Sequence, residues 1–260
     1  MTEGGKYIYC IINGGERRKF GPIGIGGRGA EVYTICCKDI GAVISDSLVA
    51  KYSICRENTL AHQEVLEAVM KDYTVLPVRF GTIAESAGNG VNPEELIKQK
   101  VLEARYEEFK NLLEKMDNKI ELGLKAVWKD INSIFREIVE DNKAIKTLKE
   151  GIIGSPFIGT REAQRAKIGE MVKDALDAKR EKEGKAICDA LKELSVDFRM
   201  NKTFGDKMLL NAAFLVDRSK EAEFDNEVNK LAAKYDDRMK FNYVGPVPAY
   251  NFVEIIVTWD

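Results

Sequence analysis

The pattern of apolar and polar residues predicts strands in both halves of the chain. Residues 6–12 (KYIYCII) are β-branched and aromatic, as in a buried strand. Strands are also expected at 31–37 and 40–46, joined as a hairpin, and at 74–80, where Pro77 indicates a sheet edge or a bulge. In the second half, the pattern predicts strands at residues 119–128, 195–201, 208–217, 239–245 and 251–257.

Apolar positions at helical spacing predict helices between these strands. One helix is expected at 56–72. A second is expected to begin at residues 92–95 (NPEE), which combine a cap, a proline in the first turn and a glutamate at the third position, and to reach about Met116. Further helices are expected at residues 130–150 and 219–235.

A long charged helix is expected from Thr160 to about Leu194. Between its two apolar stripes, residues 177–185 (DAKREKEGK) offer only one apolar side chain. A helical stretch that is polar on all sides cannot be buried along its length. The pattern therefore predicts either a helical arm in solvent or a helix–helix turn near Gly184, and we favour an arm or helical hairpin that projects from its domain.

Together these elements predict an α+β protein with two domains, which suits a chain of 260 residues. Residues 1–117 form the expected N-terminal α+β domain. Residues 118–260 follow the order strand, helix, strand, strand, helix, strand, with one extra strand, which is a modified ferredoxin-like arrangement. The charged arm at about 160–194 is then a long insertion at the first crossover helix.

Composition and charge narrow the class of protein. Apolar residues make up 45% of the chain and charged residues 32%, which favours a folded, soluble protein. The net charge of −2 argues against nucleic acid as a partner. No run approaches the roughly 20 apolar residues of a membrane span. The odd count of five cysteines without a CxxC pair, and a polar N-terminus, predict a cytoplasmic protein with reduced thiols.

Few residues in the chain suggest catalysis or the binding of a cofactor or metal ion. Residues 24–29 (GIGGRG) match the dinucleotide fingerprint, but they lead into a predicted strand, so a tight loop with positive φ is favoured over a nucleotide site. His62 is the only histidine, which excludes a multi-histidine metal site, and we interpret it as a polar residue on a helix surface or at an interface. For Arg79, inside an apolar strand, a structural ion pair is favoured over ligand binding. We assign no catalytic, cofactor-binding or metal-binding residue.

Eight segments in order resemble one known family. They are 7–9 (YIY), 20–24 (FGPIG), 32–35 (VYTI), 56–63 (RENTLAHQ), 74–82 (TVLPVRFGT), 121–128 (ELGLKAVW), 209–218 (LLNAAFLVDR) and 243–248 (YVGPVP). No single segment is decisive, but their order over nearly the whole chain resembles the GvpF/GvpL family of gas vesicle proteins. The chain departs from the family pattern at Cys55 and at residues 248–250 (PAY).

The resemblance implies an accessory or minor protein required for gas vesicle formation, located in the cytoplasm and at the gas vesicle. It implies binding to the major shell protein and other accessory proteins during assembly, and no catalysis, cofactor, nucleic acid or membrane partner. Two alternatives stay open: a structural component retained in the finished shell, and a nucleotide-dependent enzyme that uses the GIGGRG loop. Where the resemblance is densest, we expect a protein-binding surface at Arg56, Asn58, His62, Arg79 and Phe80.

Overall fold

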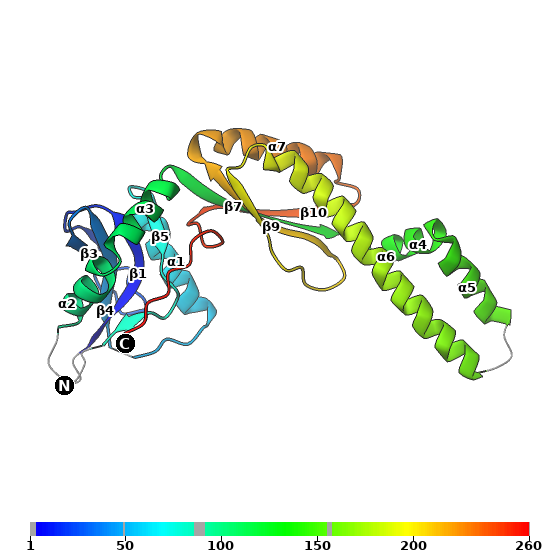
Figure 1. Ribbon diagram of the computed structural model, residues 1–260, viewed down its shortest axis with the longest axis horizontal. Coiled ribbons are helices and arrows are strands. Elements are labelled where there is room, and N and C mark those ends of the chain that lie inside the picture. Colours follow the sequence, from blue (N-terminus) through cyan, green and yellow to red (C-terminus); the bar gives the residue numbers. More distant parts are fainter. Residues whose placement is uncertain (1–3, 49, 86–91, 155–157, 260) are drawn as a thin grey trace. The chain divides into compact units, whose positions relative to one another are not determined.

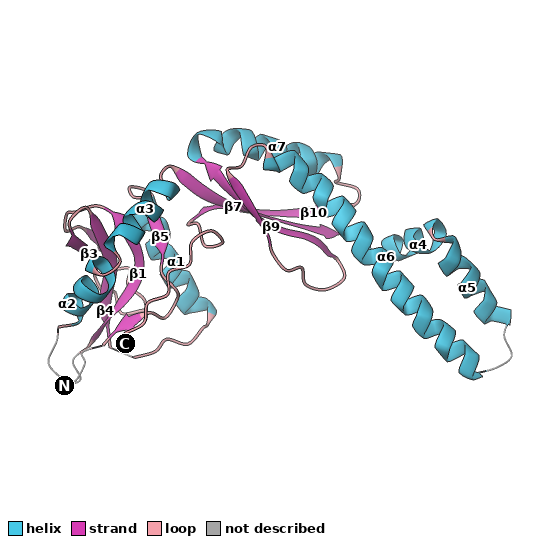
Figure 2. Cartoon of the chain, in the orientation of Figure 1, coloured by secondary structure: helices cyan, strands magenta, loops and turns pink. Residues whose placement is uncertain are grey.

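The computed structural model describes residues 4–48, 50–85, 92–154 and 158–259 and mixes helices with sheets, as the predicted α+β class requires (Figure 2). The chain divides into two compact units. The first unit contains Met1–Glu121 together with Gly245–Asp260, and the second contains Leu122–Val244. The sequence interpretation counted residues 245–260 in the second domain, whereas their contacts lie in the first unit.

The first unit is built on a six-stranded sheet with the order β2-β3-β4-β1-β5, in which β6 also pairs with β1 (Figure 1). Lys38 has a φ of 54° in the short turn between β3 and β4, which confirms the expected hairpin. β5 ends the strand order, so the expectation of a sheet edge at Pro77 is also confirmed. The strands are β1 (Gly5–Asn13), β2 (Lys19–Gly21), β3 (Val32–Cys37), β4 (Ile40–Ser47), β5 (Val75–Pro77) and β6 (Ile83–Ala84).

Helices complete the core of the first unit. α1 (Arg56–Met70) buries Val65, Leu66 and Val69 against a cluster that includes the rings of Tyr7 and Tyr9 from β1. The expected helix from 92 to 116 forms with two interruptions, and the Asn92 side chain accepts a hydrogen bond of 2.9 Å from the Glu94 amide, as the capping sequence predicted. Its parts are α2 (Pro93–Ile97), the π-helical turn η1 (Lys98–Glu103) and α3 (Tyr106–Met116).

The second unit contains a four-stranded sheet with the order β10-β7-β9-β8. The Phe224 ring lies 5.2 Å from the Phe214 ring, which packs α7 against β9. The element order agrees with the expected one from residue 119 to β10, and the ferredoxin-like description stays a prediction. The elements are β7 (Lys119–Trp128), β8 (Asp197–Met200), β9 (Met208–Asp217), the short η2 (Arg218–Lys220), α7 (Glu221–Lys234) and β10 (Met239–Val247).

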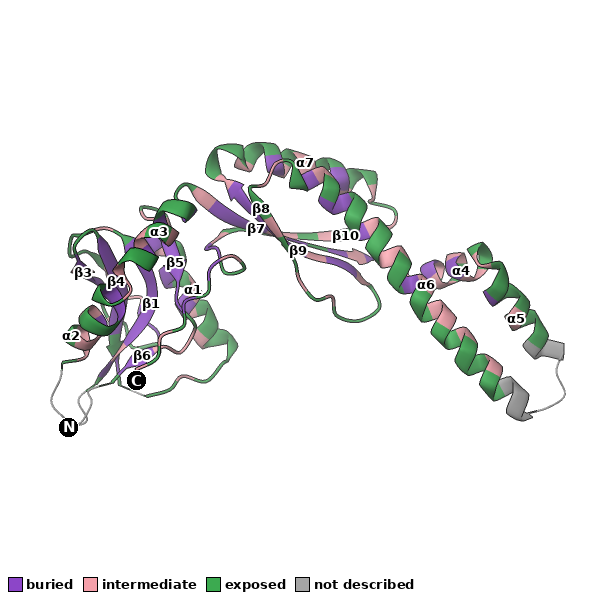
Figure 3. Ribbon diagram, viewed as in Figure 1, coloured by how far each residue is buried: buried purple, intermediate pink, exposed green. Residues whose placement is uncertain are grey.

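The inserted helices of the second unit form a hairpin. α4 (Ile131–Asp141) and α5 (Lys143–Gly154) both contact the long α6 (Ile158–Lys192). The expected single helix at 130–150 breaks at Asn142, whose side chain accepts a hydrogen bond of 3.1 Å from the Ala144 amide and so begins α5. α6 continues through Gly184, which excludes the turn considered there. Much of α5 and of the first half of α6 is exposed (Figure 3).

The charged stretch at 177–185 behaves differently from the sequence expectation, because it packs against the sheet of the second unit. Gly184 is buried, and a Cβ placed on it would lie 3.0 Å from the carbonyl oxygen of Leu209. Arg180 Nε donates to the Met208 carbonyl at 2.9 Å, and Trp128 Nε1 donates to Glu183 at 2.8 Å. Hydrogen bonds satisfy these polar groups, so a helix that is polar all round is held against the sheet.

Candidate protein-binding groove

A groove of about 370 Å³ lies on the first unit. Three segments that are distant in sequence form it: α1, the residues that end and follow β5, and the C-terminal segment. α1 contributes positions i, i+3 and i+4, which share one helix face. The lining residues are Thr59, His62, Gln63, Pro77, Val78, Arg79, Phe80, Tyr250, Val253, Glu254 and Ile255.

The C-terminal segment lies along the edge of the first sheet without forming the strand predicted at 251–257. Ile255 makes one parallel bridge to Val78, and its carbonyl accepts a hydrogen bond of 3.1 Å from the Arg79 amide. Val253 and Ile255 are buried, whereas Glu254 between them is exposed. Burial therefore alternates at these three residues as it does in a strand, but β5 is too short to support a full ladder.

His62 is buried at the inner wall of the groove, with 5% of its surface exposed. Its Nδ1 lies 3.0 Å from the hydroxyl of Tyr7, and its ring stacks on Tyr9. Burial lowers the pKa of His62 to about 4, so the imidazole is neutral at neutral pH. Of the two interpretations of His62, a position on the helix surface is wrong, because β1 supplies a buried hydroxyl partner that the local sequence of the helix does not reveal. A position at an interface stays a prediction.

Arg79 is exposed at the groove. No carboxylate in the part of the chain that the structure describes lies within ion-pair distance of its guanidinium. The favoured interpretation, a structural ion pair, therefore finds no partner among the described residues and stays a prediction. The backbone of Arg79 joins the C-terminal segment, which leaves its side chain directed to solvent. An unpaired arginine beside buried apolar residues can bind a carboxylate.

Three of the five predicted site residues come together in the groove. Phe80 is half-buried there, and its ring centroid lies 5.6 Å from that of His62. Arg56 is exposed at the first turn of α1 and does not line the groove. The Asn58 side chain donates to the Ser53 carbonyl at 3.0 Å, which gives it a local structural contact outside the groove.

The sequence interpretation missed the C-terminal residues of the groove, Tyr250, Val253 and Ile255. These residues lie more than 160 positions from the others along the chain, so no local pattern connects them. The strand predicted at 251–257 indicated an ordered segment but did not reveal which sheet it would lie against.

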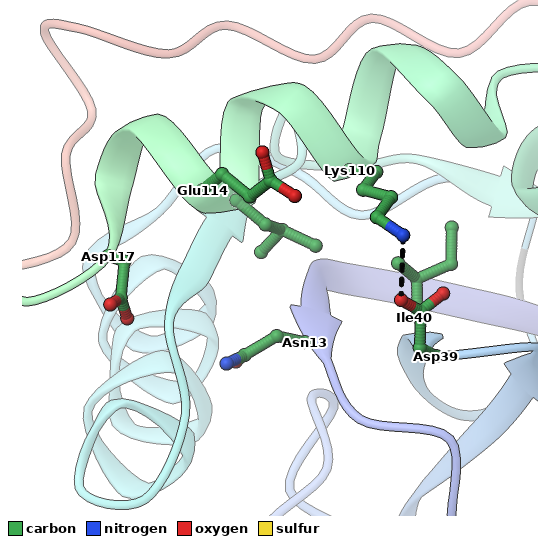
Figure 4. A pocket seen from close by; sticks show the side chains of 7 residues that line it. Asn13, Asp39, Ile40, Lys110, Glu114 and Asp117 are labelled. Carbon is green, nitrogen blue, oxygen red and sulfur yellow. Dashed lines mark ion pairs between the residues drawn. The ribbon is translucent and has the colours of Figure 1, made fainter.

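A second pocket, of about 410 Å³, lies on the first unit between α3 and the ends of β1 and β4 (Figure 4). Lys110 pairs with Asp39 at 3.3 Å, and Thr74 donates to Asp117 at 3.1 Å. The lining residues are Asn13, Asp39, Ile40, Lys110, Leu113, Glu114 and Asp117. Within the described ranges, no three His, Cys, Asp or Glu side chains are arranged to hold a metal ion, so this pocket offers no metal site.

The GIGGRG loop has the geometry of a tight turn. Gly26, Gly27 and Gly29 have φ values of 96°, 67° and 64°, and the loop leads into β3. The preference for a turned loop is confirmed, because glycine adopts positive φ without steric cost. A dinucleotide site would instead require the loop to open a helix.

The chain is similar in sequence and in fold to known gas vesicle proteins. A relative from Halobacterium salinarum, gas vesicle protein F1, is 26% identical over 258 residues, which cover 98% of this chain and 95% of the relative. Gas vesicle protein F of Streptomyces sp. strain CB03234 is 30% identical over 76% of this chain and 78% of its own length. The crystal structure of GvpF from Anabaena sp. PCC7120 superposes with a TM-score of 0.81 at 21% identity, over 98% of this chain and all of that one (100%).

Of the helices in the described part of the chain, none has the length and apolar character that crossing a membrane requires. A family model described as gas vesicle synthesis protein GvpL/GvpF matches residues 5–254. Because this match spans nearly the whole chain, the protein belongs to the GvpL/GvpF family of gas vesicle synthesis proteins.

Proposed function

We propose that this protein is an accessory protein of gas vesicle formation that acts without catalysis by binding the major shell protein and other accessory proteins during assembly. The groove on the first unit is the binding surface. A shell subunit that faces gas must expose apolar surface, which aggregates in water unless a partner covers it. A folded partner with a partly apolar groove can cover such a segment before the segment enters the shell.

The observation that carries the proposal is the composition of this groove. The partly exposed rings of Phe80 and Tyr250 lie in it together with an exposed arginine that has no ion-pair partner in the described ranges. Aromatic side chains and arginine inside a polar rim are the usual composition of a protein-binding surface. Two of the segments that form the groove, 56–63 and 74–82, also carry the resemblance to the family.

The test is co-expression of this protein with the major shell protein, followed by affinity capture and size-exclusion chromatography. We expect one co-eluting complex for the wild-type protein. Arg79→Glu introduces a repelling charge at the groove and should reduce capture of the shell protein at least tenfold. Arg165→Glu is the matched control, because Arg165 is an exposed arginine on α6 of the second unit.

Each outcome has a definite meaning. Capture by the wild-type protein and by Arg165→Glu, but not by Arg79→Glu, supports the groove. Equal capture by all three would retain the binding role and reject the groove as its site. A wild-type protein that captures neither the shell protein nor another gas vesicle protein would contradict the proposed function.

A further inference from the structure

Building on the proposed function, we infer that the groove recognises a peptide segment of its partner in which one carboxylate lies next to apolar side chains. The Nε2–H of His62 and the guanidinium of Arg79 are the donors to this carboxylate. The apolar side chains of the segment pack on the exposed parts of the Phe80 and Tyr250 rings. These assignments follow from the hydrogen bonds around His62, from the exposed guanidinium of Arg79, which has no ion-pair partner in the described ranges, and from the distribution of charge in the groove.

The hydrogen bonds around Tyr7 determine which nitrogen of His62 carries the proton. The Gly81 amide donates to the Tyr7 hydroxyl oxygen at 3.0 Å, and the same oxygen lies 3.0 Å from Nδ1 of His62. The Tyr7 hydroxyl is buried, and Nδ1 of His62 is the one acceptor that the described residues place within hydrogen-bond distance of its O–H, so Tyr7 donates to Nδ1. Because the imidazole is neutral at neutral pH, its proton lies on Nε2.

The Nε2–H group of His62 is left as an unused donor. His62 lines the groove, and no described residue accepts a hydrogen bond from Nε2. Nε2 is not among the buried polar atoms that lack a partner, so it keeps access to the groove. A donor on a side chain with only 5% of its surface exposed can be satisfied by an acceptor that enters the groove.

Arg79 supplies the positive charge. Its backbone is fixed by hydrogen bonding to Ile255, whereas its guanidinium is exposed and unpaired within the described ranges. A guanidinium binds a carboxylate through paired hydrogen bonds, which are about twice as strong as hydrogen bonds between neutral groups. The neutral N–H donor of His62 together with the exposed, positively charged guanidinium of Arg79 favours a carboxylate over a neutral amide.

Glu254 limits which segments fit. It is exposed between the buried side chains of Val253 and Ile255, so it places one negative charge at the rim of the groove. A segment with several acidic residues would be repelled there. The segment that fits has a single carboxylate and is otherwise apolar, which complements both Arg79 and the partly exposed rings of Phe80 and Tyr250.

The test uses the full-length protein labelled with nitrogen-15 and two synthetic peptides, acetyl-Val-Leu-Glu-Val-amide and the same peptide with glutamine in place of glutamate. His62 is the only histidine, so its two ring nitrogens give one assignable pair of NMR signals. We expect the glutamate peptide to shift the Nε2 signal in a saturable manner. The glutamine peptide should bind about tenfold more weakly, because one hydrogen bond to a charged group is lost.

Two controls separate the possible causes of a shift. Arg79→Gln should lower the affinity for the glutamate peptide to that for the glutamine peptide, while Arg165→Gln should not. Equal affinities for the two peptides, or no shift of Nε2 at millimolar peptide, would overturn the inference. An equal response to acetate would also overturn it, because the site would then bind any small carboxylate.

The shell-protein capture assay distinguishes failure of this inference from failure of the proposed function. Arg79→Gln and His62→Gln variants that still capture the shell protein as the wild-type protein does would reject carboxylate recognition and leave the binding role intact.

Discussion

Asn251 donates two hydrogen bonds to the carboxylate of Glu121, one from its backbone amide at 2.7 Å and one from its side chain at 2.5 Å. These residues are 130 positions apart in the chain, and both belong to the first unit. Glu121 is buried, and burial raises the pKa of its carboxyl group, although the two hydrogen bonds oppose that rise. The pair anchors the C-terminal segment that forms one wall of the groove.

Removal of this anchor should loosen the C-terminal segment. We expect Glu121→Ala to lower the free energy of unfolding by about 1–3 kcal/mol, because the two donors of Asn251 lose their buried, charged acceptor. Amide hydrogen exchange at Val253 and Ile255 should accelerate. Glu121→Gln, which keeps one acceptor oxygen and removes the buried charge, should lie closer to the wild-type protein. Unchanged exchange at both residues in Glu121→Ala would show that the pair does not hold the segment.

Protonation of His62 should make the fold less stable in mild acid. The pKa of His62 is lowered from 6.5 to about 4 in the folded protein, so between these values the unfolded chain binds a proton that the folded protein does not. Stability is therefore full above pH 6.5 and falls as the pH decreases, by about 1 kcal/mol between pH 6.5 and 5.5.

The control for this prediction is His62→Gln, which removes the only histidine. Urea unfolding at a series of pH values should give a flat profile between pH 6.5 and 5.5 for this variant, at a lower stability because the contact with Tyr7 is altered. A slope of the same size in both proteins would assign the pH dependence to other groups.

The ion pairs at the base of the helical hairpin should stabilise the second unit. Arg238 donates to Glu137 at 2.6 and 2.9 Å and to Glu183 at 2.8 Å. We expect Arg238→Ala to lower the free energy of unfolding by about 1–2 kcal/mol, a value reduced by partial exposure of the pairs. Lys230→Ala, which removes an exposed pair with Glu227, should change stability by less than about 0.5 kcal/mol.

The same ion pairs predict a second pH dependence. Hydrogen bonding from Arg238 lowers the pKa of Glu137 to about 2, so its stabilising contribution is present above its ordinary value of 4.5 and is lost as the pH falls from 4.5 towards 2. Thermal unfolding of Glu137→Gln should lose this part of the acid dependence. If Arg238→Ala and Lys230→Ala prove equally stable, the bidentate geometry adds nothing to stability.

Two glycines of α6 provide a matched comparison. A Cβ at Gly169 would meet no atom within 4 Å, whereas a Cβ at Gly184 would lie 3.0 Å from the Leu209 carbonyl oxygen. Gly169→Ala should therefore stabilise the protein by about 0.5–1 kcal/mol through helix propensity. Gly184→Ala should show none of this gain, because the helix must move away from β9. Equal gains in thermal unfolding would contradict the close packing of α6 on the sheet.

Local chemistry allowed several elements to be predicted from the sequence. The edge position of Pro77, the cap at Asn92 and the hairpin turn at Lys38 each depend on the residue itself and its immediate neighbours. The physical cause of each feature lies in the residue and its neighbours in the chain, so one sequence is sufficient to identify it.

The site residues were harder to interpret because their surroundings come from distant segments. His62 is buried because Tyr7 lies opposite it. Arg79 is exposed, and it is its backbone amide that bonds to the C-terminal segment. The stretch 177–185 was expected to be solvated, yet Glu183 and Arg180 find partners on the sheet. Polarity predicts exposure only where no partner is supplied by the fold.

The most direct measurement of the central claim is photo-crosslinking in cells that form gas vesicles. A photoreactive amino acid placed at Phe80, which lines the groove, should crosslink this protein to the major shell protein. The same amino acid at Lys182, exposed on α6, is the control. A shell-protein crosslink at Phe80 that is absent at Lys182 is the predicted result. A crosslink at Lys182 alone, or at neither position, would contradict binding of the shell protein through this groove.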